Sequence, residues 1–212
     1  MRNLLLAASL ASLPLLSTAQ TTEAPHFYVG AGAFLAASDP FQDYSTTRVG
    51  PALTAGRQFT PRLALQLSGA YTWRDYGSST VTSFAGSVPT GTYDYKFHDK
   101  ALTFPLLLRA TLTNPAKRLR VDALGGPVLR VNLSRFESSE TYLGQTSSYR
   151  TERYTTSDFL VTLGPALRYT VTPQVALVVD ALVSIGVNGY FRNFNGRLSS
   201  NVLAGVHYNF GG

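Results

Sequence analysis

The sequence of 212 residues contains no cysteine. Disulfide bridges, thiolate metal sites and lipid attachment at an amino-terminal cysteine are therefore excluded. Charged residues are also scarce, at 14%, yet the mean hydropathy of +0.02 is too low for a bundle of membrane-spanning helices. With 44% hydrophobic and 12% aromatic residues, the chain is too apolar to be disordered. Its length fits one folded domain.

Long apolar runs are missing as well. The longest run, residues 4–16, is shorter than the roughly 20 residues that a membrane-spanning helix needs. It follows the basic Arg2 and precedes small residues at positions 17–19, which is the pattern of a secretory signal peptide. We therefore expect residues 1–19 to be cleaved off, which lowers the net charge from +6 to +5. Residues 20–212 then form the mature domain.

What the mature sequence does contain is alternation with a period of two. Between Arg62 and Trp73, leucine, glycine and aromatic residues occupy every second position, and smaller or polar residues lie between them. This alternation indicates a strand with one apolar face. Eight segments show it: residues 26–36, 49–59, 62–73, 102–112, 119–133, 159–171, 175–185 and 202–210.

The connections between these segments alternate in length. Short turns are expected at residues 60–62, 113–118 and 172–174. Longer polar loops are expected at residues 38–48, 75–96, 134–155 and 187–197. An even number of strands with short turns at one end and long loops at the other is typical of a membrane barrel. The sequence therefore predicts an all-β fold, an eight-stranded antiparallel up-and-down transmembrane β-barrel.

The strand faces decide between a soluble barrel and a membrane barrel. A soluble barrel is apolar inside, whereas a membrane barrel is apolar outside and polar inside. Each arginine on the lipid-facing side would cost about 2–4 kcal/mol at the bilayer midplane. The mixed faces should therefore point into the lumen, and they carry Gln66, Arg109, Arg120, Asp122, Arg130, Arg168, Asp180 and His207.

Aromatic residues fall near the ends of the apolar faces, as interfacial girdles require. The periplasmic rim should comprise Phe27, Phe59, Tyr169, Tyr208 and Phe210, and the outer rim Tyr71, Trp73, Phe104 and Phe159. Arg57 breaks the pattern, because it shares the apolar face of its strand. Either Arg57 extends to the periplasmic headgroups, or a bulge at Gly56 turns it away.

Taken together, the leader, the eight strands and the aromatic end of the last strand resemble the small bacterial outer-membrane β-barrel family. This family includes the transmembrane domain of outer membrane protein A and the adhesion-type barrels. The resemblance implies a monomer in contact with outer-membrane lipid. It also implies that the barrel-assembly machinery recognises the terminal strand through Phe210, although Gly211 and Gly212 follow that aromatic residue here.

The charges of the lumen are expected to form a network. If Leu112 lies opposite Leu119, Arg109 directly faces Asp122 in the neighbouring strand. Arg168 and Asp180 should lie near one another diagonally. Eight strands leave a lumen just wide enough for side chains, so such a network favours a plug. The lumen would contain four arginines and two aspartates, which leaves positive charge unpaired. A narrow anion-favouring pore or small-solute transporter is therefore the alternative.

The sequence offers little for catalysis. The mature chain has three histidines, His26, His98 and His207, and no set of nucleophile, base and orienting group can be chosen. We therefore expect no cofactor, no metal site and no nucleic-acid partner. The loops at 75–96 and 134–155 are rich in Ser, Thr, Gly and Tyr, a composition that suits either a recognition surface or plain solvation.

Three functions are consistent with these observations. The first is a non-enzymatic barrel that supports the envelope or presents its long loops to an extracellular ligand. The second is the narrow pore, and the third is a lipid-modifying barrel enzyme.

Overall fold

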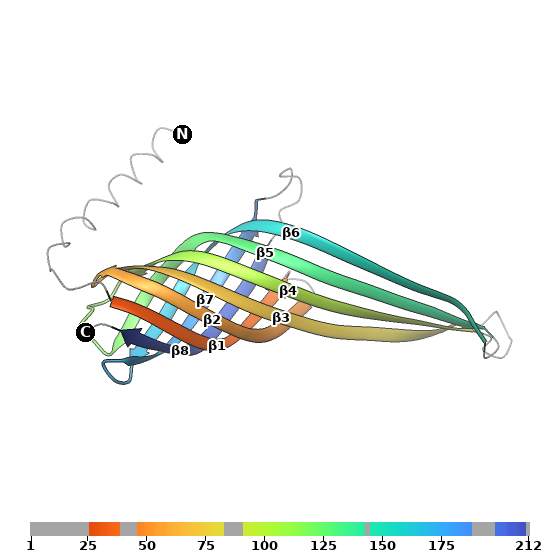
Figure 1. Ribbon diagram of the computed structural model, residues 1–212, viewed down its shortest axis with the longest axis horizontal. Coiled ribbons are helices and arrows are strands. Elements are labelled where there is room, and N and C mark those ends of the chain that lie inside the picture. Colours follow the sequence, from red (N-terminus) through yellow and green to blue (C-terminus); the bar gives the residue numbers. More distant parts are fainter. Residues whose placement is uncertain (1–25, 39–45, 83–90, 143–144, 188–197, 211–212) are drawn as a thin grey trace, which may run out of the picture.

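The computed structural model describes residues 26–38, 46–82, 91–142, 145–187 and 198–210. Within this part of the chain, eight antiparallel strands close into a barrel in which β8 pairs with β1 (Figure 1). The predicted fold is thus confirmed. The strands are β1 (His26–Ser38), β2 (Thr46–Thr60), β3 (Leu63–Thr82), β4 (Gly91–Thr111), β5 (Leu119–Tyr142), β6 (Gln145–Thr170), β7 (Val175–Gly186) and β8 (Leu198–Phe210). The predicted signal peptide lies outside the described residues.

Among the described residues, no helix has the length and apolar character needed to cross a membrane.

The short turns are closed by their own polar side chains. The hydroxyl oxygens of Thr60 and Thr172 accept hydrogen bonds from backbone N–H groups three residues later, each at 3.0 Å. In the turn between β4 and β5, the Asn114 side-chain oxygen accepts a hydrogen bond from the Ala116 N–H, also at 3.0 Å. These turns lie at the end of the barrel where β1 begins and β8 ends (Figure 1). Short turns mark the periplasmic side of bacterial membrane barrels.

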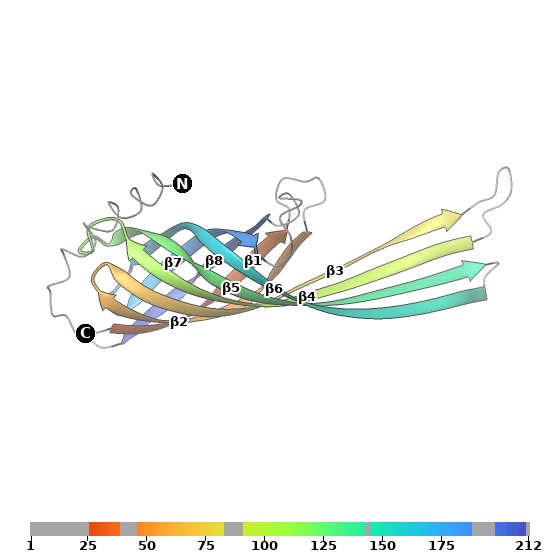
Figure 2. The ribbon, with the colours of Figure 1, turned by 90° about the horizontal axis from the view of Figure 1, so that it is seen from above.

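Two of the predicted long loops are wrong, because most of their residues are strands. β3 and β4 together reach Thr82 and Gly91, and β5 and β6 reach Tyr142 and Gln145. The four strands continue far beyond the barrel as one sheet, which we call the extension (Figure 2). Their composition is polar because neither face of the extension meets lipid or a core, while Thr and Tyr still favour strands. Because loops have the same polar composition, these residues are predicted as loops from the sequence.

The wall of the barrel is apolar outside and mixed inside. Along β7, Leu177, Val179 and Val183 are exposed on the outer face. Between them, Val178 and Asp180 are buried on the inner face. The lumen is filled by side chains and holds two small apolar clusters, one around Phe34 and Leu203 and one around Leu107 and Leu124. On β7 the charged Asp180 lies between Val178 of one cluster and Leu182 of the other.

Candidate functional site

One arginine of β4 connects three other strands across the lumen. The Arg109 side chain is 1% exposed. Its Nη1 donates to Asp122 Oδ2 of β5 at 2.7 Å, and its Nη2 donates to Asp180 Oδ1 of β7 at 3.0 Å. Nε and Nη2 also donate to Gln66 Oε1 of β3, at 3.2 and 2.7 Å. Because both carboxylates and the amide are themselves 0–1% exposed, these four side chains fill the barrel at this level.

The strand register behind this cluster differs from the predicted one. Leu112 does not face Leu119, because its backbone N–H donates to the carbonyl of Val121 at 2.9 Å. As a result, Thr111 lies opposite Asp122 and Arg109 lies opposite Leu124. A shift of two residues keeps every side chain on its own face. Arg109 therefore still points inward and reaches Asp122 diagonally.

Arg168 of β6 completes the charge balance of the central cluster. Its Nη2 donates to Thr111 Oγ1 at 3.1 Å and to Asp122 Oδ1 at 3.4 Å. Its register partner on β7 is Val178, and the carboxylate that it contacts is that of Asp122 rather than the diagonal Asp180. Two arginines thus share two aspartates at the middle of the lumen.

Two aromatic rings beside the cluster fit against glycines, a feature that the sequence analysis missed. Tyr28 donates its hydroxyl proton to Gln66 Oε1 at 3.3 Å and stacks on His207 with ring centroids 4.8 Å apart. A Cβ atom at Gly56 would lie 2.1 Å from the Tyr28 ring, and one at Gly30 would lie 2.3 Å from the His207 ring. Each glycine is the register partner of the ring that covers it. The contact between each glycine and its ring can be predicted only when the strand register is known.

The other arginines of the lumen lie toward its two ends. On the extracellular side, Arg130 Nη2 donates to Ser199 Oγ at 3.1 Å, and Arg48 Nη1 donates to Asn132 Oδ1 at 3.3 Å. The Nε atoms of both arginines are buried without a hydrogen-bond partner. At the periplasmic end, Arg120 Nε donates to the carbonyl of Lys117 at 3.2 Å. Within the described residues, none of these three arginines forms an ion pair.

Arg48 was not among the predicted lumen residues, because residues 38–48 were assigned to a loop.

The aromatic residues predicted for the two rims all lie exposed on the outer wall: Phe27, Phe59, Tyr169, Tyr208, Phe210, Tyr71, Trp73, Phe104 and Phe159. Arg57 lies among them, with its Cζ 5.3 Å from the ring centroid of Phe27 and 5.4 Å from that of Phe59. The pairing of β2 with β3 is continuous from Leu53 to Gln58. A bulge at Gly56 is therefore wrong, and Arg57 stays on the outer face.

The extension has two different faces. The face that continues the lumen carries a row of rings, which we call the aromatic row: Tyr76, Phe97 and Phe136 are register partners on β3, β4 and β5. Ring centroids are 4.9 Å apart for Tyr76 and Phe97 and 4.6 Å apart for Phe97 and Phe136. The opposite face carries the ion pairs of His98 with Asp75 at 2.7 Å and of Arg135 with Glu137 at 2.5 Å. A further ion pair, Arg150 with Glu152, lies on the face of the aromatic row, because Glu152 is the register partner of Phe136.

His98 and Asp75 are the arrangement nearest to a catalytic pair outside the lumen. They are register partners, and the Asp75 partner was missed because Asp75 was placed in a loop. Ser79 carries a hydroxyl on the same face. Its register partner is Asp94, which lies four residues from His98 along β4. This separation is about 13 Å at the usual rise of a strand. Ser79 is therefore too far along the sheet to form a hydrogen bond with His98.

Metal binding has no basis in the described residues, among which no three histidine, aspartate or glutamate side chains gather.

A closed antiparallel barrel with an apolar outer wall, aromatic rims and a charged lumen defines a transmembrane β-barrel of the bacterial outer membrane. A family model for the outer membrane protein beta-barrel domain matches residues 42–192, and the chain belongs to this family. Its location is the bacterial outer membrane.

Several solved outer-membrane structures are similar to the chain. A major outer membrane protein of Thermus thermophilus shares 14% identity with a TM-score of 0.50, over 89% of this chain and 100% of that one. Ail of Yersinia pestis, solved in complex with the heparin analogue sucrose octasulfate, shares 14% identity with a TM-score of 0.46, over 89% and 100%. Neisserial surface protein A shares 20% identity with a TM-score of 0.41, over 89% and 100%. At these identities the likeness concerns the fold. No match is found among the curated proteins.

Proposed function

We propose that the chain is a sealed, non-enzymatic barrel whose function is to hold the extension outside the cell, where its aromatic row binds an extracellular partner. The observation that carries this proposal is the contrast between the two parts of the chain. The lumen is filled at the level of Arg109, whereas four strands continue beyond the barrel and carry a row of rings on the face that continues the lumen.

The aromatic row supports a binding role because it has no second layer packed on it among the described residues. Tyr76 is 37% exposed and Tyr93, further along the same face, is 39% exposed. Aromatic side chains contribute large contact areas at low conformational cost and are enriched at binding hot spots. Phe97 stacks on Tyr76 and contacts Phe136 at a tilt, so the three rings support one another.

The filled lumen supports a surface role over the pore alternative. Gln66, Arg109, Asp122 and Asp180 are each at most 1% exposed, and they bond to one another across the barrel. Eight strands leave room for side chains or for one small ligand, and open porins need many more strands.

The binding role is tested on an array of immobilised glycans and peptides, using the full mature chain in nanodiscs. We expect the wild-type protein to bind a subset of spots and a Tyr76→Ser/Phe97→Ser variant to lose at least tenfold in signal. Tyr149→Ser is the matched control, since Tyr149 is 65% exposed and lies on the opposite face of the extension. Binding no stronger than that of empty nanodiscs, or equal binding by both variants, would overturn the proposal.

The enzymatic alternative is tested separately by mass spectrometry of envelope lipids. Cells with and without the chain should show the same lipid species. A lipid species that appears only when the chain is present would show that the barrel is an enzyme.

A further inference from the structure

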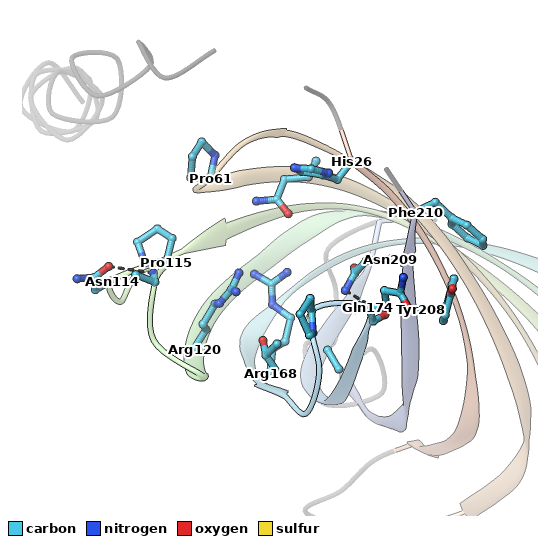
Figure 3. A pocket seen from close by; sticks show the side chains of 15 residues that line it. His26, Pro61, Asn114, Pro115, Arg120, Arg168, Gln174, Tyr208, Asn209 and Phe210 are labelled. Atoms are coloured by element: carbon cyan, nitrogen blue, oxygen red, sulfur yellow. Dashed lines mark hydrogen bonds between the residues drawn. The ribbon is translucent and has the colours of Figure 1, made fainter. Parts of the chain in front are cut away.

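A cavity of about 770 Å³ opens at the short-turn end of the barrel, on the side opposite the extension (Figure 3). Its wall includes inward-facing residues near the ends of β5 and β6, and residues of the turns and of β8. The cavity contains two arginines, Arg120 and Arg168, and no acidic residue lines it within the described chain. Its volume falls in the range of about 300–1,000 Å³ that small-molecule sites occupy.

The two arginines face each other directly. Arg120 of β5 and Arg168 of β6 are register partners, and Figure 3 shows their side chains side by side in the cavity. Like charges at directly opposed positions of neighbouring strands destabilise a sheet. The only carboxylate in contact with either arginine, within the described residues, is that of Asp122, which Arg109 also shares. Since Arg109 and Arg168 already share the carboxylates of Asp122 and Asp180, the positive charge of Arg120 has no carboxylate partner within the described residues.

Both guanidinium groups also keep unused donors. Arg120 donates through Nε only, to a backbone carbonyl, and Arg168 donates through Nη2 only, among the described residues. Arg168 is 8% exposed, and its Nε is buried without a partner. A buried donor without a partner is costly. Planar guanidinium groups match a carboxylate through two parallel hydrogen bonds.

We propose that this cavity binds the free carboxylate of a peptide that enters from the periplasm. The carboxylate would be held between Arg120 and Arg168. The peptide groups next to the carboxylate would then form hydrogen bonds with amide side chains of the lining: Gln58, Asn114, Gln174 and Asn209. The site is independent of the proposed surface function, because it lies at the other end of the molecule.

The position of the cavity favours a water-soluble peptide over a lipid headgroup. Arg120 and Arg168 project from the inner face of the wall, as do their register neighbours Asp122 and Ala166. Lipid lies against the outer face, where Leu119, Leu167 and Tyr169 are exposed. A headgroup would have to pass around the periplasmic edge of the wall, beyond Tyr208 and Phe210, to reach the pair.

The test uses the full mature chain refolded in detergent micelles, with the arginine Nε–Hε signals followed by NMR. Four probes are added in turn: N-acetyl-L-Ala-L-Ala, N-acetyl-D-Ala-D-Ala and the carboxamide of each. We expect an acid to shift the Arg120 and Arg168 signals and to bind at least tenfold more tightly than its amide, because hydrogen bonds between ionised partners are stronger than those to a neutral amide. Binding of only the D-peptide would assign the ligand to cell-wall stem peptides, and binding of the L-peptide would assign it to protein termini.

The variants decide whether the cavity is the site. Arg120→Gln leaves the central cluster intact and should weaken binding of the acid at least tenfold. Arg118→Gln is the matched control, because it removes the same charge from an exposed turn residue that does not line the cavity. Equal binding by the two variants, equal binding of acid and amide, or no binding of either acid would overturn the proposal.

Discussion

Arg109 and Asp122 form an ion pair at 2.7 Å although neither residue is the other's partner in the strand register. The arginine faces Leu124 and the aspartate faces Thr111, so the contact runs diagonally across two neighbouring strands. The length of the arginine side chain allows this reach and lets the same guanidinium contact Asp180 on β7. The lumen is therefore closed by contacts between strands that are not neighbours in the sheet.

Removal of Arg109 should strongly destabilise the barrel. In an Arg109→Met variant, Asp122 keeps only Arg168 and Asp180 keeps only the amide of Gln66 among the described residues. Breaking a buried pair by removing one partner costs about 3–5 kcal/mol, because a charge stays buried without compensation. Urea unfolding followed by the fluorescence of Trp73, the single tryptophan, measures this loss.

The matched control also removes the charges of the two carboxylates that lose Arg109 as a partner. An Arg109→Met/Asp122→Asn/Asp180→Asn variant should recover much of the lost free energy of unfolding. An Arg109→Met variant as stable as the wild type would contradict the structural role of the central cluster.

The wild-type barrel should show no resolved current in planar bilayers. The four side chains of the central cluster leave almost no exposed surface at that level of the lumen. An Arg109→Ala/Gln66→Ala variant removes the two longest of them and should produce small conductance steps. Arg130 lies outside this cluster, so an Arg130→Ala variant should show no resolved current. A wild-type anion-selective current that Arg109→Ala alters would instead establish the pore.

The sequence predicts the barrel well because lipid and lumen impose opposite demands on alternate residues. Leu177, Val179 and Val183 had to share the lipid face, and Asp180 had to point inward. The register could not be predicted to better than two residues, because turns of different length keep the same alternation. The extension could not be told from loops by composition, because Ser, Thr and charged residues surround the alternating Tyr93, Tyr95 and Phe97 of β4. The Tyr28 contact with Gly56 depends on the register and so could not be seen either.

Substitution of Gly56 should disturb the lumen more than its size suggests. A Cβ atom at this position would lie 2.1 Å from the ring of Tyr28, which is 3% exposed and has little room to move. We expect Gly56→Ala to lower the free energy of unfolding by about 1–3 kcal/mol, the usual cost of overpacking. Gly69→Ala is the control, because its Cβ would meet Phe104 at an ordinary 3.7 Å. Equal unfolding midpoints in urea for the two variants would argue against the ring contact.

Arg57 should stabilise the periplasmic rim despite its place on the outer wall. Its guanidinium lies over the rings of Phe27 and Phe59, and each such contact contributes about 0.5–1 kcal/mol at an exposed site. Arg57→Gln keeps a polar side chain but removes the cation, so we expect a loss of about 1–2 kcal/mol in unfolding from lipid vesicles. A Phe27→Leu/Phe59→Leu background should abolish most of this difference. If the effect of Arg57→Gln is the same in both backgrounds, the rings are not its partners.

The extension should be able to loosen without the barrel. In the aromatic row Phe97 stacks on Tyr76 and makes a tilted contact with Phe136, and each ring pair contributes about 0.5–1.5 kcal/mol beyond its buried area. Phe97→Ala removes both pairs, while the central cluster lies elsewhere along β3 to β6 and on β7. We expect faster protease cleavage within residues 91–97 and 136–142 and an unchanged heat-dependent shift of the barrel on gels. Tyr149→Ala, on the opposite face, should leave the cleavage rate as it is. A Phe97→Ala barrel that also unfolds more easily would mean that the two parts fold as one cooperative unit, because loss of the ring pairs would then reach the membrane-embedded wall.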